Sequence, residues 1–169
     1  MKLTAADVKW LFEKLRSVDF LSYHSEEELT ELVQSIEKIQ FGDKETIIRQ
    51  GQRSKAFYII RSGSVTVWAE TPDGREHLAD LTGDDSFGEV SILTGEVCNA
   101  SVTADGDADL FVLRPESLRR IVQANPILAE KMAFAVAERK GVRVLGLDPS
   151  AMPSTTLAER VKTFFGLSP

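Results

Sequence analysis

Apolar residues recur every three to four positions at the start of the chain, which is the spacing of an amphipathic helix. The pattern predicts one helix that begins at Thr4 and ends near Ser17. A second predicted helix follows Ser25, which together with Glu28 forms a capping box, the usual signal of a helix N-terminus. Its apolar face consists of Leu29, Leu32, Val33 and Ile36. Two helices therefore precede the rest of the chain.

From about residue 38 the hydrophobic period changes from 3.6 to 2, the period of a strand with one buried face. Turn residues divide this region into short strands, and Pro72-Asp73-Gly74 is a strong hairpin turn. Short strands at even spacing are typical of a β-barrel or β-sandwich. Residues 87–93 interrupt the pattern and predict a single helical turn. The predicted strands are 38–41, 46–49, 56–61, 64–70, 76–81, 101–103 and 108–113.

The last third of the chain returns to helical spacing. Pro115 suits the first position of a helix over 116–123, and a longer helix begins at Asn125-Pro126 and fades between Gly141 and Gly146. The order of elements predicts an α+β fold, in which helices flank an antiparallel, jelly-roll-like β-roll with one inserted helix. The expected divisions are a helical bundle (1–37), the β-roll (38–114), two helices (115–146), and a linker with a short amphipathic helix (147–169).

Composition agrees with one ordinary globular domain, because the 169 residues are 43% hydrophobic and 27% charged. The 20 basic and 26 acidic residues give a net charge of −6, which argues against a nucleic-acid partner. No apolar run reaches the length of about 18 residues that a membrane span requires. The single Cys98 cannot form an internal disulfide and is typical of a reducing cytoplasm.

Catalytic and metal-binding patterns are absent from the sequence. Its two histidines, His24 and His77, are too few for a three-histidine metal centre. The sequence contains neither a nucleophile elbow nor a Walker phosphate loop. Asp105, Asp107 and Asp109 lack the ligand count of a calcium loop and predict a hairpin turn instead. We therefore expect a protein that is not an enzyme and that holds neither a metal nor a cofactor.

Two stretches resemble the cyclic nucleotide-binding domain family, in its catabolite-activator-like and channel-type forms. The first comprises residues 47–52 and 57–63. The second resembles the family's phosphate-binding cassette and reads Phe87-Gly88-Glu89-Val90-Ser91-Ile92-Leu93-Thr94-Gly95-Glu96. The resemblance covers about residues 18–140, and it implies a ligand, cyclic AMP or cyclic GMP, held by a cassette over 87–101 and a lid helix from Pro126. The ligand-binding residues that it implies are Gly88, Glu89, Val90, Cys98, Asn99 and Ala100.

The cassette also has a physical rationale of its own. Gly88 permits a close approach of the backbone to a ligand, and the N–H groups at the start of the following helix attract an anion. Glu89 can accept hydrogen bonds from a ribose hydroxyl, but it would repel a phosphate beside it. A cation must therefore lie close to the phosphate, and in the family this is the cassette arginine, a bidentate partner of the phosphate oxygens.

This chain departs from the family at that arginine. Where the family reads Gly-Glu-Pro-Arg-Ser-Ala-Thr-Val, the chain reads Gly95-Glu96-Val97-Cys98-Asn99-Ala100-Ser101-Val102. Residues 76–113 contain nine acidic residues and neither lysine nor arginine. The loss of a bidentate charged pair weakens binding by about a hundredfold. The candidates for a replacement cation are Arg49, Arg53, Lys55 and Arg61.

Three side chains near the cassette have an alternative interpretation. Cys98 is interpreted as a small residue in place of the arginine and not as a redox-sensitive thiol, because no cation nearby lowers its pKa. Asn99 either contacts the ligand or is an exposed loop residue, and the sequence leaves both open. His77 is expected to be a solvated strand residue.

Two functions remain. The first is a cyclic nucleotide-binding regulatory module of weakened affinity that controls a channel or another effector. The alternative is a degenerate homology domain that works as an interaction or autoregulatory module, in which segment 157–167 fills the pocket or makes a dimer contact. A helix-turn-helix regulator is disfavoured because only about 25 residues follow the long helix. The C-terminal residues resemble those of bacterial mechanosensitive-channel relatives, which implies the cytoplasmic face of a membrane protein as one location.

Overall fold

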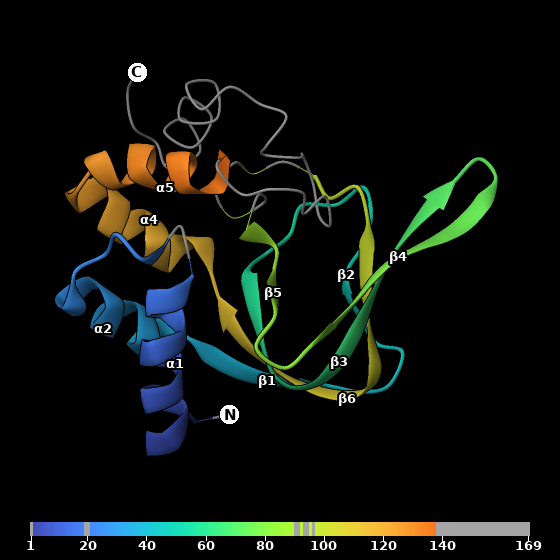
Figure 1. Ribbon diagram of the computed structural model, residues 1–169, viewed down its shortest axis with the longest axis horizontal. Coiled ribbons are helices and arrows are strands. Elements are labelled where there is room, and N and C mark those ends of the chain that lie inside the picture. The colour runs from blue at the N-terminus through green and yellow to red at the C-terminus, as the bar shows by residue number, and fades with distance from the viewer. Residues whose placement is uncertain (1, 19–20, 90–91, 93–94, 96, 138–169) are drawn as a thin grey trace.

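The computed structural model describes residues 2–18, 21–89, 92, 95 and 97–137, and of residues 133–137 the backbone alone. Figure 1 shows the helices packed against one end of a rolled sheet, with a β-hairpin that projects from the opposite side. The elements are α1 (Ala5–Ser17), α2 (Glu26–Ser35), β1 (Glu37–Phe41), β2 (Thr46–Ile48), β3 (Phe57–Thr71), β4 (Gly74–Thr82), β5 (Ser86–Phe87), β6 (Ser101–Leu113), α4 (Pro115–Ala124) and α5 (Ile127–Ala137).

The sheet is antiparallel throughout its described strand pairs, in the order β1-β6-β3-β4. β2 pairs with β6 and β5 pairs with β3, so the sheet curls into a roll. The predicted α+β fold, an antiparallel β-roll flanked by N-terminal and C-terminal helices, is confirmed.

Both N-terminal helices begin where the sequence predicts. The Thr4 hydroxyl accepts a hydrogen bond from the Asp7 N–H at 3.1 Å, and the Asp7 carboxylate accepts one from the Thr4 N–H at 3.0 Å. Ser25 and Glu28 form the same reciprocal pair at the start of α2. These side chains satisfy N–H groups that have no partner within the helix, which fixes where each helix starts. Pro115 occupies the first turn of α4, also as predicted.

Two predicted turns proved to be irregularities inside long strands. The predicted strands 56–61 and 64–70 form one strand, β3, and 101–103 and 108–113 form β6. Gly63 has a φ of +85°, and a Cβ atom there would collide with the Asp107 carbonyl. Gly106 has a φ of +76°. The hairpin turn predicted at residues 105–109 is therefore wrong: glycines in the left-handed region let both strands bulge, and pairing continues on either side.

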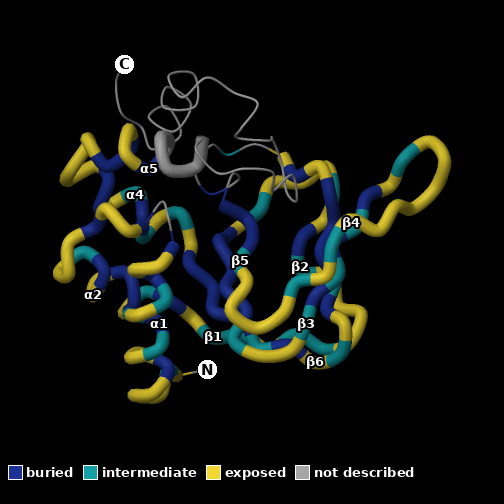
Figure 2. The backbone as a smooth tube through the Cα atoms, viewed as in Figure 1, coloured by how far each residue is buried: buried dark blue, intermediate teal, exposed yellow. Residues whose placement is uncertain are grey.

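The buried residues form two apolar clusters (Figure 2). The first four residues of β3 are all buried, so alternate residues face different clusters. We call one cluster the helix-side core; it contains Leu11, Leu15, Leu21, Leu32, Ile92, Leu118 and Leu128 together with Phe57, Ile59, Phe111 and Leu113 of the strands. We call the other the roll-side core; it contains Ile48, Ala56, Tyr58, Ile60, Val65, Val67, Phe87, Cys98, Ala100, Val102 and Leu110.

A charged and aromatic cluster attaches α1 to the roll. Asp7 is only 4% exposed and lies 3.6 Å from the Lys38 amine and 3.8 Å from the Arg61 guanidinium. Arg61 also stacks over the Trp10 ring at 4.8 Å, and Trp10 packs against Phe111 with 5.6 Å between ring centroids. These contacts join α1 to β1, β3 and β6.

His24, in the loop before α2, is 6% exposed, and neither of its ring nitrogens has a hydrogen-bond partner among the described residues. Burial lowers the pKa of this imidazole, although the charge of Glu28 opposes the shift. The folded protein therefore favours the neutral ring.

Candidate functional site

Phe87 anchors the start of the predicted cassette, residues 87–101, in the roll. It belongs to β5, pairs with Tyr58 of β3, and is 1% exposed. The two rings are stacked, with 5.0 Å between centroids and 15° between planes. Burial raises the pKa of the Tyr58 phenol, so this ring is neutral at ordinary pH. The sequence carries no signal for a special role of Tyr58, because this residue is one position of an apolar strand.

Gly88 follows in a conformation that favours glycine. Its φ is +91°, and a Cβ atom at this position would lie 2.8 Å from the Ala56 carbonyl oxygen and 3.4 Å from the Ser54 hydroxyl. The Ser54 hydroxyl in turn donates a hydrogen bond of 2.7 Å to the same Ala56 oxygen. The glycine therefore lets the backbone lie close to Ala56, and this contact seats the cassette on the segment before β3.

Glu89 starts the short helix and is 8% exposed, so it is a buried carboxylate and not a surface acid. The Ile92 N–H donates to the Gly88 carbonyl at 3.2 Å, which closes one helical turn. Ile92 is 1% exposed and belongs to the helix-side core, whereas Phe87 belongs to the roll-side core. The cassette thus touches both cores. Val90, the third predicted ligand residue, lies outside the described residues.

The second half of the cassette is held beside residues 51–53. The Cys98 N–H donates to the Gln52 carbonyl and the Gly51 N–H donates to the Cys98 carbonyl, both at 2.8 Å. Cys98 is 1% exposed and Ala100 is fully buried, and both belong to the roll-side core. Asn99 between them is exposed. The structure therefore brings Cys98 and Ala100 to the interior, where the apolar surroundings keep the thiol inert.

The pairing of Arg53 shows where this candidate cation lies. Arg53 forms an antiparallel bridge with Val97, and directly opposite residues of such a pair share a face. Val97 is 51% exposed, whereas its neighbour Cys98 faces the interior. Arg53 accordingly shares the outer face and not the Cys98 face.

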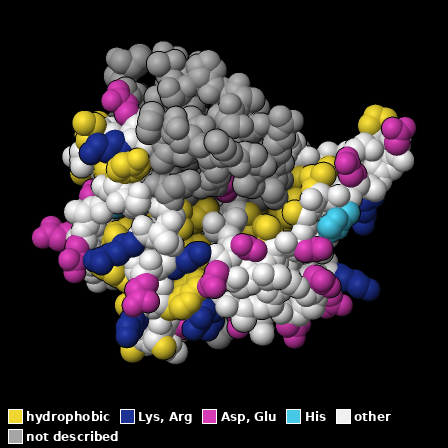
Figure 3. Space-filling view, in the orientation of Figure 1, with side chains coloured by type: hydrophobic (Ala, Val, Ile, Leu, Met, Phe, Trp, Pro, Cys, Tyr) yellow, Lys and Arg dark blue, Asp and Glu magenta, His cyan; other side chains and the backbone are white. Residues whose placement is uncertain are grey.

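Arg61 lies on the α1 side of the roll, beside Asp7 and Trp10. Arg49 and Lys55 are exposed. Because Arg53 shares the outer face and Arg61 lies beside α1, neither guanidinium lies on the Cys98 side of the cassette, where the family has its arginine. On the face in Figure 3, acidic side chains lie over both the helices and the strands, whereas most of the basic ones lie over the helices.

The other candidate residues lie away from the cassette. His77 is an exposed residue of β4, as predicted, and its Nε2 atom lies 3.0 Å from an Asp80 carboxylate oxygen. Among the described residues, no group of three or more histidine, cysteine, aspartate or glutamate side chains is placed to hold a metal ion. Within the same part of the chain, no helix has the length and hydrophobicity needed to cross a membrane.

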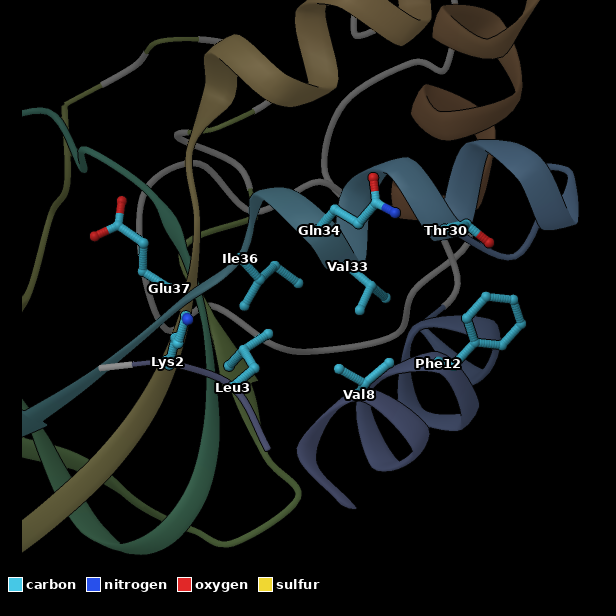
Figure 4. A pocket seen from close by; sticks show the side chains of 9 residues that line it. All are labelled: Lys2, Leu3, Val8, Phe12, Thr30, Val33, Gln34, Ile36 and Glu37. Carbon is cyan, nitrogen blue, oxygen red and sulfur yellow. The ribbon is translucent and has the colours of Figure 1, made fainter. Parts of the chain in front are cut away.

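A separate apolar groove of about 590 Å³ lies between α1, α2 and the residues before α1 (Figure 4). Val8 and Phe12 of α1 face Val33 of α2 across it. None of the residues that line this groove belongs to the cassette. It is therefore distinct from the candidate ligand site.

Comparisons with known proteins agree on one family. The sequence profile described as "Cyclic nucleotide-binding domain" matches residues 38–125. Over 113 residues the chain is 36% identical to a cAMP-dependent protein kinase regulatory subunit of Dictyostelium discoideum. The match covers 64% of this chain and 35% of that protein. It is 33% identical over 123 residues to the cyclic nucleotide-gated channel alpha-4 of Mus musculus, covering 69% of this chain and 20% of the channel. The chain thus spans only a minor part of these relatives.

A solved structure gives the same fold. The regulatory domain of Toxoplasma gondii PKA, crystallised with cAMP, superposes with a TM-score of 0.69 and 16% identity, over 94% of this chain and 58% of that one. At this identity the likeness supports the fold alone.

Proposed function

Because the chain belongs to the cyclic nucleotide-binding domain family, we propose that it is a regulatory module. In this proposal the cassette takes a cyclic purine nucleotide with weakened affinity, and the flanking helices pass the ligand state to an effector. The proposed contacts are the backbone around Gly88, the Glu89 carboxylate, and the interior positions Cys98 and Ala100.

The construction of the first half of the cassette carries this proposal. Gly88 adopts a left-handed conformation directly against Ala56, and the acid next to it is buried. A carboxylate accepts hydrogen bonds, and a ribose supplies hydroxyl groups that can donate them. A glycine in a conformation that other residues rarely adopt, followed by a buried acid, is better explained by a binding site than by a simple connection between strands.

The two cores supply a route for the signal. Phe87 and Cys98 belong to the roll-side core, whereas Ile92, one helical turn beyond Gly88, belongs to the helix-side core with α1, α2, α4 and α5. A ligand that shifts the cassette relative to the roll therefore also alters the packing of the helices. Only a ligand with different affinities for the two arrangements can change their populations. We propose residues 1–37 and 115–146 as the responding units.

The names of the two curated relatives supply the effector class. They describe a regulatory subunit of a protein kinase and a cyclic nucleotide-gated channel. We propose that this module controls an effector of that kind. A mechanosensitive-type channel is one candidate for the larger protein to which the module belongs.

Isothermal titration of the full 169-residue chain tests the proposal, with cyclic AMP and then cyclic GMP as the titrants. We expect saturable binding in the sub-millimolar range, because a family site without its bidentate pair loses about a hundredfold in affinity. The variant Cys98→Arg should bind more tightly, and Cys98→Ser, which keeps the size without adding charge, should not. Absence of heat and of any shift in melting temperature at saturating nucleotide, in the wild type and in Cys98→Arg, would refute the proposal.

One observation favours a second function, an interaction module that works without nucleotide. The arginine position is occupied by a residue that is 1% exposed in an apolar cluster, and Arg53 faces away from it. In this alternative the segment 157–167, which lies outside the described residues, fills the pocket or joins two copies. Deletion of residues 148–169 should then change nucleotide access or the oligomer size measured by light scattering. No change in either would count against the alternative.

A further inference from the structure

We propose that the apolar groove between α1 and α2 is a self-association surface, at which two copies of this chain form a two-fold symmetric dimer. The groove shares no lining residue with the cassette, so this surface is additional to the function proposed above. The apolar lining of the groove and the charges of its two walls support the proposal.

Apolar side chains of both helices line the groove. Val8 and Phe12, one helical turn apart, form a ridge on α1 that points toward Val33 of α2 (Figure 4). Leu11 and Leu15 of α1 are fully buried in the helix-side core, whereas Val8 is 41% exposed. The apolar stripe of α1 is therefore wider than the core of its own chain covers. A ridge beside a groove is the form of surface with which helices pack against one another.

The two walls of the groove differ in charge. Lys9 of α1 lies three positions before Phe12, so it flanks the apolar ridge. α2 contains four glutamates and no basic residue, and one of them, Glu27, lies three positions before Thr30, which lines the groove. Both Lys9 and Glu27 are exposed, and neither forms an ion pair within the described part of the chain. The α1 wall is thus basic beside the ridge, and the α2 wall is acidic.

This distribution of charge identifies the occupant as a second copy. An anionic membrane surface would require a uniformly basic rim, and a basic peptide would require a uniformly acidic one. A groove with one basic and one acidic wall is complementary to itself, because a two-fold axis along the groove places α1 of each copy against α2 of the other. Arg16 and Glu26, which lie 3.9 Å apart within one chain, show that side chains of the two walls attract.

In the proposed dimer the ridge of Val8 and Phe12 on each copy enters the groove of the other copy. Lys9 of one copy then lies against Glu27 of the other, and the same contact occurs twice. Two short helices from each copy give an interface at the small end of the range for specific complexes. We therefore expect a weak dimer that dissociates on dilution.

Sedimentation equilibrium of the full chain tests the proposal, at about 10 µM to 1 mM protein and at about 0.05 and 0.5 M salt. We expect the mass to rise toward twice that of the monomer with concentration. The association should weaken at high salt, because the charges of the walls are exposed and are therefore screened. A monomer at every concentration and both salt levels would overturn the proposal.

A charge on the ridge tests the surface. Val8→Glu should weaken association at least tenfold, because the dimer would bury the new carboxylate in an apolar groove. Leu78→Glu is the matched control, since Leu78 of β4 is 40% exposed and lies outside the groove, and it should associate as the wild type does. Circular dichroism checks that both variants are folded. Equal association of the two variants would assign the dimer to another surface and overturn the proposal.

Reversal of the wall charges tests the orientation and does not disturb the core. Lys9→Glu and Glu27→Lys each replace two attractions with two repulsions, so each variant alone should associate about tenfold more weakly. An equimolar mixture of the two variants should associate as the wild type does, because each reversed wall then faces a wall of opposite charge. A mixture that associates no better than either variant alone would refute the packing of α1 against α2.

The same measurements distinguish other occupants of the groove. A chain that stays monomeric, and whose Val8→Glu variant melts earlier than Leu78→Glu, would mean that segment 157–167 of the same chain fills the groove, which would overturn the dimer. Nucleotide titration is read separately. A monomer that still binds cyclic nucleotide would overturn this proposal and leave the proposed function standing, and a dimer that binds no nucleotide would do the reverse.

Discussion

Replacement of Asp7 tests how firmly α1 is held on the roll. Asp7→Ala removes the carboxylate that accepts the Thr4 N–H, which costs about 1 kcal/mol for a lost cap. It also removes two ion pairs, to Lys38 at 3.6 Å and to Arg61 at 3.8 Å. The Lys38 and Arg61 side chains are 19% and 35% exposed, and both ion-pair distances are long. Each ion pair therefore contributes about 0.5–1 kcal/mol to the stability of the fold. We expect a total loss of about 2–3 kcal/mol.

The pH dependence separates the charge from the cap. The hydrogen bond from the Thr4 backbone is the main cause that holds the pKa of Asp7 below its usual range, and the Lys38 charge adds to it. A carboxyl with a lowered pKa in the folded state stabilises the fold above its ordinary pKa of about 3.9. That contribution is lost as the pH falls through the lower folded pKa. Asp7→Asn keeps an acceptor oxygen but cannot ionise, so its disadvantage at pH 7 should shrink below about pH 4.

Urea unfolding followed by circular dichroism at pH 7 and at about pH 3 measures both effects. Asp73→Asn, at the exposed β3–β4 turn, is the matched control and should change stability by less than about 0.5 kcal/mol. The reasoning is refuted if Asp7→Ala costs no more than the control, or if the gap between wild type and Asp7→Asn is the same at both pH values.

Two further substitutions test the cassette and the buried imidazole. Gly88→Ala should destabilise the fold by about 2 kcal/mol or more in urea unfolding, because it combines a left-handed φ with a 2.8 Å contact to the Ala56 carbonyl oxygen. The control Gly74→Ala, at a φ of +119° with no atom within 4 Å of the added Cβ, should show the conformational cost alone. Equal losses of stability in the two variants would contradict the argument from the Ala56 contact. Because burial lowers the pKa of His24, the unfolded state takes up protons first, so the melting temperature should fall as the pH drops below about 6.5. His24→Leu should flatten this dependence of the melting temperature on pH, and the control His77→Gln, at an exposed position, should not. Identical dependences in the wild type and both variants would contradict the argument from His24.

Local signals in the sequence were sufficient for the starts of the helices. A capping box specifies a helix start through hydrogen bonds between residues three positions apart, so Thr4 and Ser25 could be interpreted without knowledge of the fold. The Phe87-Gly88-Glu89 motif is likewise contiguous, and the structure buries all three residues. Predictions were reliable where the interaction is short in sequence.

Features that depend on distant partners could not be predicted. Gly63 and Gly106 are ordinary turn signals, and only the pairing of β3 with β6 makes them bulges. The four candidate cations were equivalent in the sequence, and it took the bridge to Val97 to place Arg53 and the contact with Asp7 to place Arg61. Ser54 and Ala56, which support Gly88, carry no motif.

The pairing of β6 has a consequence for the order of events during synthesis. β1 and β2 pair with β6, and so does most of β3, yet β6 is the last of the described strands to be made. About 70 residues separate the end of β1 from the end of β6, which is roughly 4–14 s of translation. During that time the apolar residues of β1, β2 and β3 lack their final partner, and a nascent chain stopped before Leu113 cannot close the roll. Until the ribosome has released this strand, the growing polypeptide therefore exposes apolar surface that the finished roll buries.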